Sequence, residues 1–175
     1  PLPLCPPHTT PQLIPTLFHY TTILRSTAFV EQGCGRTESF DKLVDRKVKN
    51  PFDIEHILPD DFSSVADDFD NEADFNEWHN HIGSLLLLPA DVNRSLQDKP
   101  YEKKVAHYGK QNFYAASLNG DTYEHQPQFR QFRESHELPF EQLLQFTKAD
   151  QKKRQDLLAK LVEVIWSPNR LNELA

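Results

Sequence analysis

Two short apolar runs in the middle of the chain have the length and the boundaries of β-strands. Ile54–Leu58 is an apolar stretch interrupted by one acid and one histidine, and Leu85–Leu88 is an unbroken apolar run between Gly83 and Pro89. Short apolar runs of this kind, bounded by turn-forming residues, are typical of strands. The pattern predicts that the two strands pair to form a small hairpin.

Longer segments on both sides of this hairpin carry apolar residues at helical spacing. Tyr101, Val105 and Tyr108 stand at i, i+4 and i+7 and form one apolar face. Spacing of this kind indicates a helix whose apolar side faces a core. The predicted helices cover Thr16–Glu31, residues 37–50, Ala73–His81, a stretch that begins near Pro100, Phe140–Phe146 and Thr147–Trp166. We therefore predict a mostly helical α+β fold.

The first fifteen residues contain six prolines, which restrict the backbone and remove hydrogen-bond donors. We expect residues 1–15 to form an extended arm or linker, and residues 16–175 to form one domain. Cys5 and Cys34 provide neither a paired metal-ligand spacing nor a disulfide framework, which favours a cytoplasmic protein. No apolar run approaches the roughly 20 residues needed to span a bilayer, so we expect no membrane partner.

Charge is unevenly distributed along the chain. The net charge is −7, and the segment between Asp60 and Glu77 contains eight acidic residues and no lysine or arginine. Phosphate contacts with lysine and arginine supply most sequence-independent affinity for nucleic acid, so the overall charge argues against broad adhesion to it. We interpret the acidic segment as a solvated loop. Basic residues after the second strand are either a solvated helix face or the predicted phosphate contacts, which are Arg94, Lys99, Lys103 and Lys104.

Glu55 and His56 stand side by side on the first predicted strand, and Asn93 follows the second. Hydrolysis of a phosphodiester needs an activated water and stabilisation of charge on the phosphate. A neutral histidine can accept a proton near pH 7, and carboxylate and amide oxygens suit a hard cation such as Mg²⁺. Each residue also has an ordinary structural interpretation, with Asn93 as a turn or cap residue. The joint pattern predicts a metal-dependent nuclease centre, in which Asp53, on the same strand face as Glu55, is an extra ligand or an orienting group.

The acidic segment is followed by two histidines, His79 and His81. Histidine is a common metal ligand, so this pair is an alternative metal site. Their spacing of two residues, at the end of a short predicted helix, favours the simpler interpretation that both side chains are solvated.

The sequence resembles a known nuclease family through several motifs. Asp-x-Glu-His-Ile-x-Pro begins at Asp53, and Gly-x-Leu-x-Leu-Leu begins at Gly83. The remaining matching residues are Asn93, Asp98, Lys99, Pro100, Tyr101, Lys104, Tyr108 and, in a closing helix, Phe146, Arg154, Leu158 and Trp166. Over roughly residues 37–166 this pattern is similar to the HNH nuclease domain at the C-terminal end of GmrSD-type restriction endonucleases.

The resemblance implies a ββα-metal finger, in which two strands and a helix hold one Mg²⁺ or Mn²⁺ within a helical domain. Its core and flanking helices would cover residues 52–110, 16–50 and 126–166. His56 would be the general base, Glu55 the metal-binding acid and Asn93 the final metal-ligand position. Ser84 stands where the family usually has an asparagine that braces the histidine loop, and we place it with His56 and Asn93 in the catalytic set.

The same resemblance implies a phage-defence enzyme that cleaves DNA carrying modified bases or backbones. The nucleotide-hydrolysing partner domain of such systems has no counterpart in these 175 residues. We therefore predict a metal-dependent DNA endonuclease or nickase that another domain controls. One alternative, motivated by Ser84 and the acidic segment, is a catalytically weak or silent DNA- or partner-binding module with the same fold. A second is an acidic protein-interaction domain without a nucleic-acid role.

Overall fold

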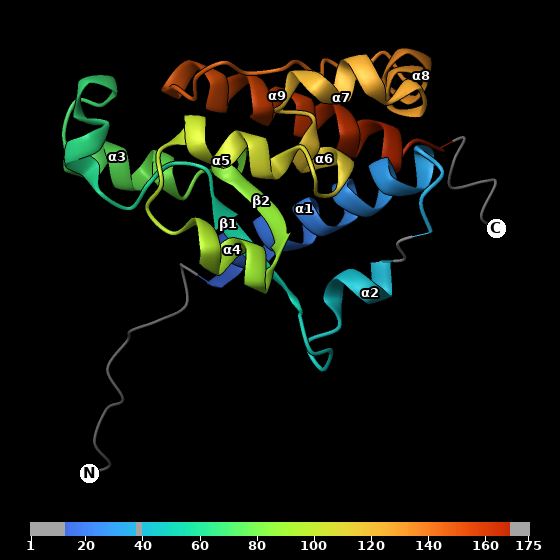
Figure 1. Cartoon of the computed structure of the whole chain (residues 1–175), viewed down its shortest axis with the longest axis horizontal. Coiled ribbons are helices and arrows are strands. Elements are labelled where there is room, and N and C mark those ends of the chain that lie inside the picture. The colour runs from blue at the N-terminus through green and yellow to red at the C-terminus, as the bar shows by residue number, and fades with distance from the viewer. Residues whose placement is uncertain (1–12, 38–39, 169–175) are drawn as a thin grey trace, which may run out of the picture.

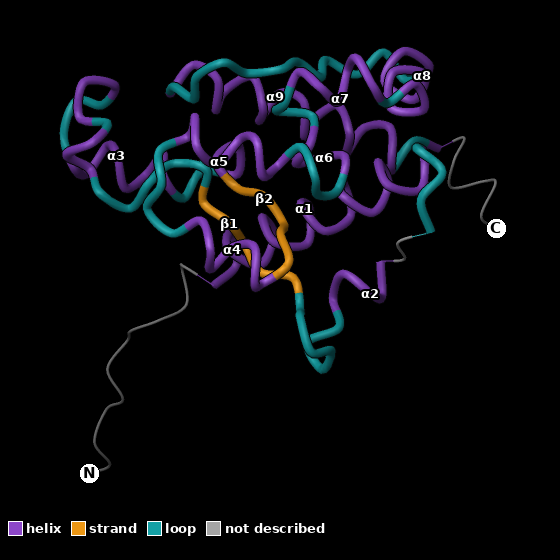
Figure 2. The backbone as a smooth tube through the Cα atoms, viewed as in Figure 1, coloured by secondary structure: helices purple, strands orange, loops and turns teal. Residues whose placement is uncertain are grey.

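The computed structural model describes residues 13–37 and 40–168, with side chains from His19 onward. These residues are mostly helical and include one two-stranded sheet (Figures 1 and 2). The strands are β1 (Phe52–His56) and β2 (Leu85–Pro89). The α-helices are α1 (Leu13–Gly33), α2 (Phe40–Val44), α3 (Glu72–His79), α4 (Ala90–Leu96), α5 (Tyr101–Tyr108), α6 (Phe113–Ala116), α7 (Gly120–His125), α8 (Pro127–Ser135) and α9 (Lys148–Ile165). The arrangement is consistent with the predicted α+β class.

β1 and β2 form the predicted antiparallel hairpin, with His56 opposite Leu85. β1 begins and ends two residues earlier than the sequence pattern indicated. Ile57 nevertheless continues the pairing, because its backbone N–H donates to the carbonyl oxygen of Ser84 at 2.9 Å. The hairpin therefore holds the backbone on both sides of His56.

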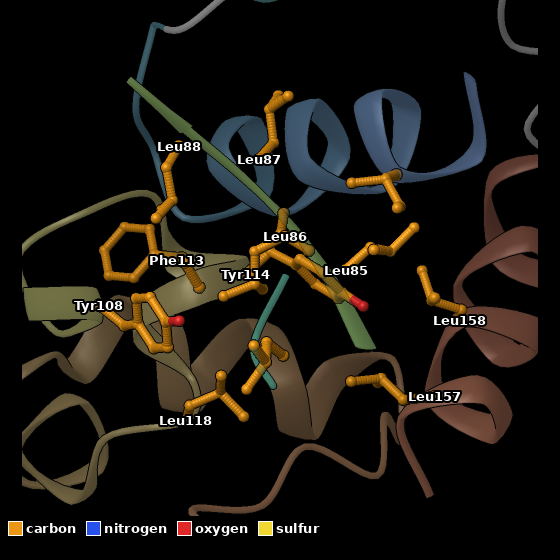
Figure 3. Close-up of a cluster of buried hydrophobic side chains, with 14 of the residues drawn as sticks. Leu85, Leu86, Leu87, Leu88, Tyr108, Phe113, Tyr114, Leu118, Leu157 and Leu158 are labelled. Atoms are coloured by element: carbon orange, nitrogen blue, oxygen red, sulfur yellow. The ribbon is translucent and has the colours of Figure 1, made fainter. Parts of the chain in front are cut away.

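The core lies around β2, whose leucines are buried from Leu85 to Leu88. α1 packs against β2, α6 and α9, while α4 packs against both strands (Figure 1). Because helices surround this strand, it shows the continuous apolar run of a fully buried strand rather than an apolar–polar alternation. Figure 3 shows the leucines of β2 among buried side chains that include Tyr108, Phe113, Tyr114, Leu118, Leu157 and Leu158.

Gly83 lies where the backbone of α9 approaches the start of β2. A Cβ atom at this position would collide with the backbone carbonyl group of Gln151. The close approach lets Nε of Arg154, a buried side chain, donate to the carbonyl oxygen of Gly83 at 2.9 Å. The glycine of the Gly-x-Leu-x-Leu-Leu motif is therefore explained by helix packing.

α9 begins where the sequence predicted a helix. The Thr147 hydroxyl accepts a hydrogen bond from the backbone N–H of Asp150, and the Asp150 carboxylate accepts one from the backbone N–H of Thr147. This reciprocal pair is a capping box, which satisfies two backbone donors at the helix start. The last predicted helix is thus confirmed.

The predicted helix over Phe140–Phe146 is wrong, because this segment is irregular. Phe140, Leu143 and Phe146 are buried, whereas Leu144 is 88% exposed. Burial at every third residue resembles helical spacing, but in this segment an irregular backbone produces the same pattern. The backbone N–H of Leu143 donates to the carbonyl oxygen of Leu118, so the segment is hydrogen-bonded to the turn after α6.

Other boundaries also differ from the predictions. α2 ends at Val44 and leaves Val48 40% exposed, so the second predicted helix is too long, and the helix start expected after Thr37 falls at residues 38–39, outside the described chain. The proline-rich arm lies mostly in the undescribed residues 1–12, while residues 13–15 already belong to α1. The short helices α4, α6, α7 and α8 were not predicted individually. None of the helices in residues 13–37 and 40–168 has the length and apolar character needed to cross a membrane.

Candidate active site

His56 lies half-buried at the end of β1, where the side chain of Asn80 meets it. Nε2 of His56 lies 3.4 Å from Oδ1 of Asn80, and Nδ2 of Asn80 donates to the carbonyl oxygen of Asn76 at 2.9 Å. The second bond fixes the amide so that its oxygen, which can only accept, faces His56. This arrangement favours the tautomer of His56 with the proton on Nε2, in which Nδ1 is the atom that can accept a proton.

The His56 ring stacks on the ring of His79, with centroids 4.3 Å apart and planes inclined by 6°. Burial lowers the pKa of His56 below its ordinary value, and the neighbouring His79 lowers this pKa further. The hydrogen bond to Asn80 and the charges of Asp60 and Glu55 act in the opposite direction without reversing the shift. The imidazole of His56 is therefore mainly neutral near pH 7, as a general base requires.

His79 projects from α3 and is only 8% exposed, so the expectation that this histidine is solvated is wrong. Nε2 of His79 lies 3.1 Å from Oδ1 of Asp60. Burial lowers the pKa of His79 below its ordinary value, and the negative charge of Asp60 acts in the opposite direction without reversing the shift. Phe75, one turn earlier on α3, packs against the His79 ring with centroids 5.2 Å apart. The i, i+4 spacing of Phe75 and His79 was the sequence signal for this burial.

His81 is also structural. Its Nδ1 accepts a hydrogen bond from the backbone N–H of Gly83 at 3.2 Å, and its ring lies against that of Trp78 with centroids 4.8 Å apart. His81 thus caps the short 3-10 turn over Ile82–Ser84. The side chain is partly exposed, so the expectation that it is solvated holds only in part.

Glu55 is buried and paired with two residues of α5. Its Oε1 lies 2.9 Å from Nζ of Lys104 and accepts a hydrogen bond from the hydroxyl of Tyr108 at 2.8 Å. Nζ of Lys104 also donates to the carbonyl oxygen of His56 at 2.8 Å. One ammonium group therefore neutralises the acid and fixes the backbone of the neighbouring histidine.

This arrangement corrects the predicted role of Lys104 as a phosphate contact. Lys104 is 1% exposed, and its position between Tyr101 and Tyr108 places it on the buried face of α5. A buried ammonium group committed to a carboxylate cannot also reach a phosphate at the surface. The other predicted cations, Arg94, Lys99 and Lys103, are exposed.

Asn93 lies on α4, the helix that follows β2 directly. Its Nδ2 donates to the carbonyl oxygen of Ile54 at 2.8 Å, which brings the side chain to the strand beside Glu55. Asp53, the extra predicted ligand, instead forms an ion pair with Arg46 at 2.8 Å. The hairpin and α4 therefore place Asn93 against the backbone of β1, although Asn93 and Ile54 are 39 positions apart in the sequence.

The predicted metal ligands can be compared with the side chains that surround them. Within residues 13–37 and 40–168, no group of three or more His, Cys, Asp or Glu side chains could hold a metal ion. The carboxylate of Glu55 and the amide oxygen of Asn93 are nevertheless hard donors of the kind that Mg²⁺ prefers, and Mg²⁺ keeps several waters. A cation at this position would share Glu55 with Lys104, whose ammonium group now neutralises the carboxylate.

Ser84 is fully buried behind the site. Its hydroxyl donates to the carbonyl oxygen of Trp78 at 2.7 Å and lies 2.5 Å from Oε1 of Gln151 on α9. Its own carbonyl oxygen accepts from Ile57, the residue after His56. Ser84 therefore braces both the end of α3 and the chain that carries His56. Complete burial excludes contact with a substrate, which corrects the placement of Ser84 in the catalytic set.

These observations define a helical domain in which a hairpin presents an adjacent acid and histidine, and in which the following helix holds an asparagine to the same strand. Residues 19–161 match the family described as GmrSD restriction endonucleases, C-terminal domain. Because the match covers more than half of the chain, the protein belongs to this family, and membership implies a nuclease role of the restriction-endonuclease type. The resemblance seen in the sequence is thus confirmed, with a start that includes most of α1 and an end before Trp166. Comparisons with curated proteins and with solved structures gave no match.

Proposed function

We propose that this domain is a divalent-metal-dependent DNA endonuclease or nickase that hydrolyses phosphodiester bonds. The strongest support is the position of His56 at the end of β1, with Nδ1 as its proton acceptor. Glu55 is the preceding residue on the same strand, and Asn93 donates a hydrogen bond to the carbonyl oxygen of Ile54. Family membership implies a nuclease, and the proposal adds the ββα-metal HNH centre, the base and the metal requirement.

In the proposed reaction, Nδ1 of His56 accepts the proton of the attacking water. Asn80 keeps the proton of the ring on Nε2, and Lys104 holds the His56 backbone through its carbonyl oxygen. Mg²⁺ or Mn²⁺, held by Glu55 and Asn93, would supply charge stabilisation at the phosphate and at the departing oxygen. The protein thus provides a fixed base, while a bound cation would provide positive charge at the phosphate.

The biological part of the proposal is a cytoplasmic effector domain of a phage-defence restriction system. Its substrate would be modified phage DNA, and a nucleotide-hydrolysing domain would control cleavage. The net charge of −7 supports a division in which another domain supplies much of the DNA affinity. Comparing cleavage of modified phage DNA and unmodified plasmid by the protein together with its nucleotide-hydrolysing partner tests this part; equal rates would contradict it.

Removal of divalent metal is expected to abolish strand cleavage. Supercoiled plasmid should be relaxed or linearised by the protein in Mg²⁺ or Mn²⁺, and EDTA should stop the reaction until excess cation restores it, because in the proposed mechanism the cation stabilises the charge at the reacting phosphate. The measurement is the rate of loss of supercoiled plasmid on gels. Cleavage that continues at the same rate in EDTA would refute the metal-dependent mechanism.

Lys103 is expected to contact the DNA backbone, since it is exposed on α5 next to the buried Lys104. Replacing Lys103 with glutamine should weaken binding equally for different sequences and reduce the salt slope of the binding constant by about 1. Fluorescence anisotropy at several salt concentrations measures this slope. The matched control is Lys160→Gln on α9, where the lysine pairs with Glu163 at the surface; equal effects from both variants would place Lys103 outside the DNA interface.

A second candidate function is a catalytically silent binding module. The ion pair between Glu55 and Lys104 favours it, because the carboxylate proposed for the metal is already neutralised. Calorimetric titration with Mn²⁺ distinguishes the two functions. Binding that is lost in Asn93→Ala supports the nuclease, whereas no binding to the wild type, together with retained DNA binding, supports the silent module.

A further inference from the structure

The acidic segment between the two strands contains a column of packed rings that ends at His56. Phe62 and Phe69 contact Phe75 with centroids 5.5 and 5.4 Å apart. Phe75 contacts His79 at 5.2 Å, and His79 stacks on His56 at 4.3 Å. Phe75 is 3% exposed and Phe69 is 7% exposed. The segment is therefore a small satellite core built against the imidazole, rather than only a solvated loop.

Two polar contacts lie at the end of this column that His79 and His56 form. Oδ1 of Asp60 lies 3.1 Å from Nε2 of His79, and Asn80, the next residue, presents its amide oxygen to Nε2 of His56. α3 is in turn held at its other end by Lys148, whose Nζ donates to the carboxylate of Asp74 at 2.7 Å. The position of α3 is thus defined at both ends.

We propose that His79, which packs between the Phe75 and His56 rings, is a positioning residue that fixes the plane and location of the His56 imidazole. This inference rests on the proposed nuclease function. A histidine ring on a strand end rotates about its side-chain bonds, and such rotation would move Nδ1 away from the position needed for proton transfer. The flat contact with His79 and the hydrogen bond to Asn80 together restrict this rotation.

His79 itself is not placed to contact a substrate. It is 8% exposed, and Asp60 next to it carries a negative charge that opposes approach of a phosphate. The groups that face His79 include the His56 and Phe75 rings, the Asp60 carboxylate, the backbone of Leu58 and, on the α5 side, the ammonium group of Lys104. Its effect on the reaction therefore passes through His56.

The test compares His79→Ala, which removes the ring, with His79→Phe, which keeps a flat ring against His56 but removes the contact with Asp60. His79→Ala should lower kcat for plasmid nicking by roughly 10- to 100-fold, the order expected for a reacting group displaced by about 1 Å, with little change in KM. His79→Phe should recover most of this loss. The matched control is His125→Ala, because His125 is exposed at the end of α7, away from α5.

A spectroscopic readout separates positioning from loss of fold. Long-range ¹H–¹⁵N correlations of the His56 ring, assigned by comparison with His56→Gln, should show a single tautomer protonated at Nε2 in the wild type and in His79→Phe. His79→Ala should show averaged tautomers and the loss of the ring-current shift from the stack, at a temperature where thermal unfolding shows the variant to be folded.

The outcomes separate the two proposals. Wild-type cleavage with unchanged kcat in His79→Ala would overturn the positioning role and leave the nuclease proposal intact. A lower kcat with an unchanged His56 spectrum would also overturn it, because the loss would then not pass through His56. A wild type that binds DNA with the expected His56 spectrum but does not cleave, in any divalent metal, would overturn the nuclease proposal and with it the catalytic meaning of the stack.

Discussion

Replacing His56 with alanine is expected to slow plasmid cleavage by about 10²- to 10⁴-fold, the usual contribution of a positioned general base. Nδ1 of this ring accepts the proton from water in the proposed reaction, and no other described histidine occupies the end of β1. The backbone contact to Lys104 uses the His56 carbonyl oxygen, so it remains in the variant. The measurement is the initial rate of plasmid relaxation in Mg²⁺ at saturating DNA.

The control for this experiment is His125→Ala, which removes an exposed histidine from the same domain. Thermal unfolding of both variants should stay close to that of the wild type, which shows that the rate reflects chemistry. Cleavage by His56→Ala at the wild-type rate would mean that another group activates the water. Loss of activity in both variants would point to a general effect on the fold.

Replacing Lys104 with methionine is expected to destabilise the domain by about 3–5 kcal/mol, as when one partner of a buried ion pair is removed. Glu55 and Lys104 are 4% and 1% exposed, so the variant would leave a buried carboxylate without its positive partner. The chain would also lose the bond from Lys104 to the His56 carbonyl oxygen. Urea unfolding followed by circular dichroism measures the change in free energy.

A second variant shows whether the loss comes from the unpaired charge. Combining Lys104→Met with Glu55→Gln removes both charges and should recover a large part of the stability, because a buried ion pair contributes little compared with uncharged packing. Lys103→Met, next along the helix at an exposed position, should change stability by only about 0.5 kcal/mol. Equal effects of Lys103→Met and Lys104→Met would show that the pair is not buried in solution.

The sequence predicted the elements whose signals are local. The leucine run of β2, bounded by Gly83 and Pro89, predicts the strand correctly, and the Thr147–Asp150 cap marks the start of α9. The apolar spacing from Tyr101 to Tyr108 likewise predicts α5. These segments are long or strongly patterned, so their own residues determine the structure.

Elements that depend on distant contacts were missed or misread. α6 and α7 are too short for apolar periodicity to emerge. Phe140–Phe146 has helical spacing but pairs with Leu118. Lys104 was assigned to the surface because lysine is rarely buried without a partner, and its partner Glu55 lies 49 positions away in the sequence.

Only part of the candidate site was predicted, because the site also depends on contacts between residues that are distant in the sequence. The motif identified Glu55, His56 and Asn93, and the structure brings Asn93 to the backbone of β1. Sequence reasoning did not identify the support for His56, because the many acidic residues after Asp60 indicated a solvated loop rather than the column of packed rings that ends at His56. The composition of such a segment is dominated by its solvated residues. The few residues that face inward determine how it packs, and composition does not identify them.

Gly83 has no side chain that could take part in the proposed reaction, yet the site depends on it. α9 rests directly on its backbone, and the next residue, Ser84, connects this contact to the end of α3 and to the chain beside His56. A methyl group at position 83 would occupy the space of the Gln151 carbonyl group, so the helix and the turn would have to separate. The tolerance of this enzyme to sequence change is thus limited by clearance between backbones as well as by the chemistry of its side chains.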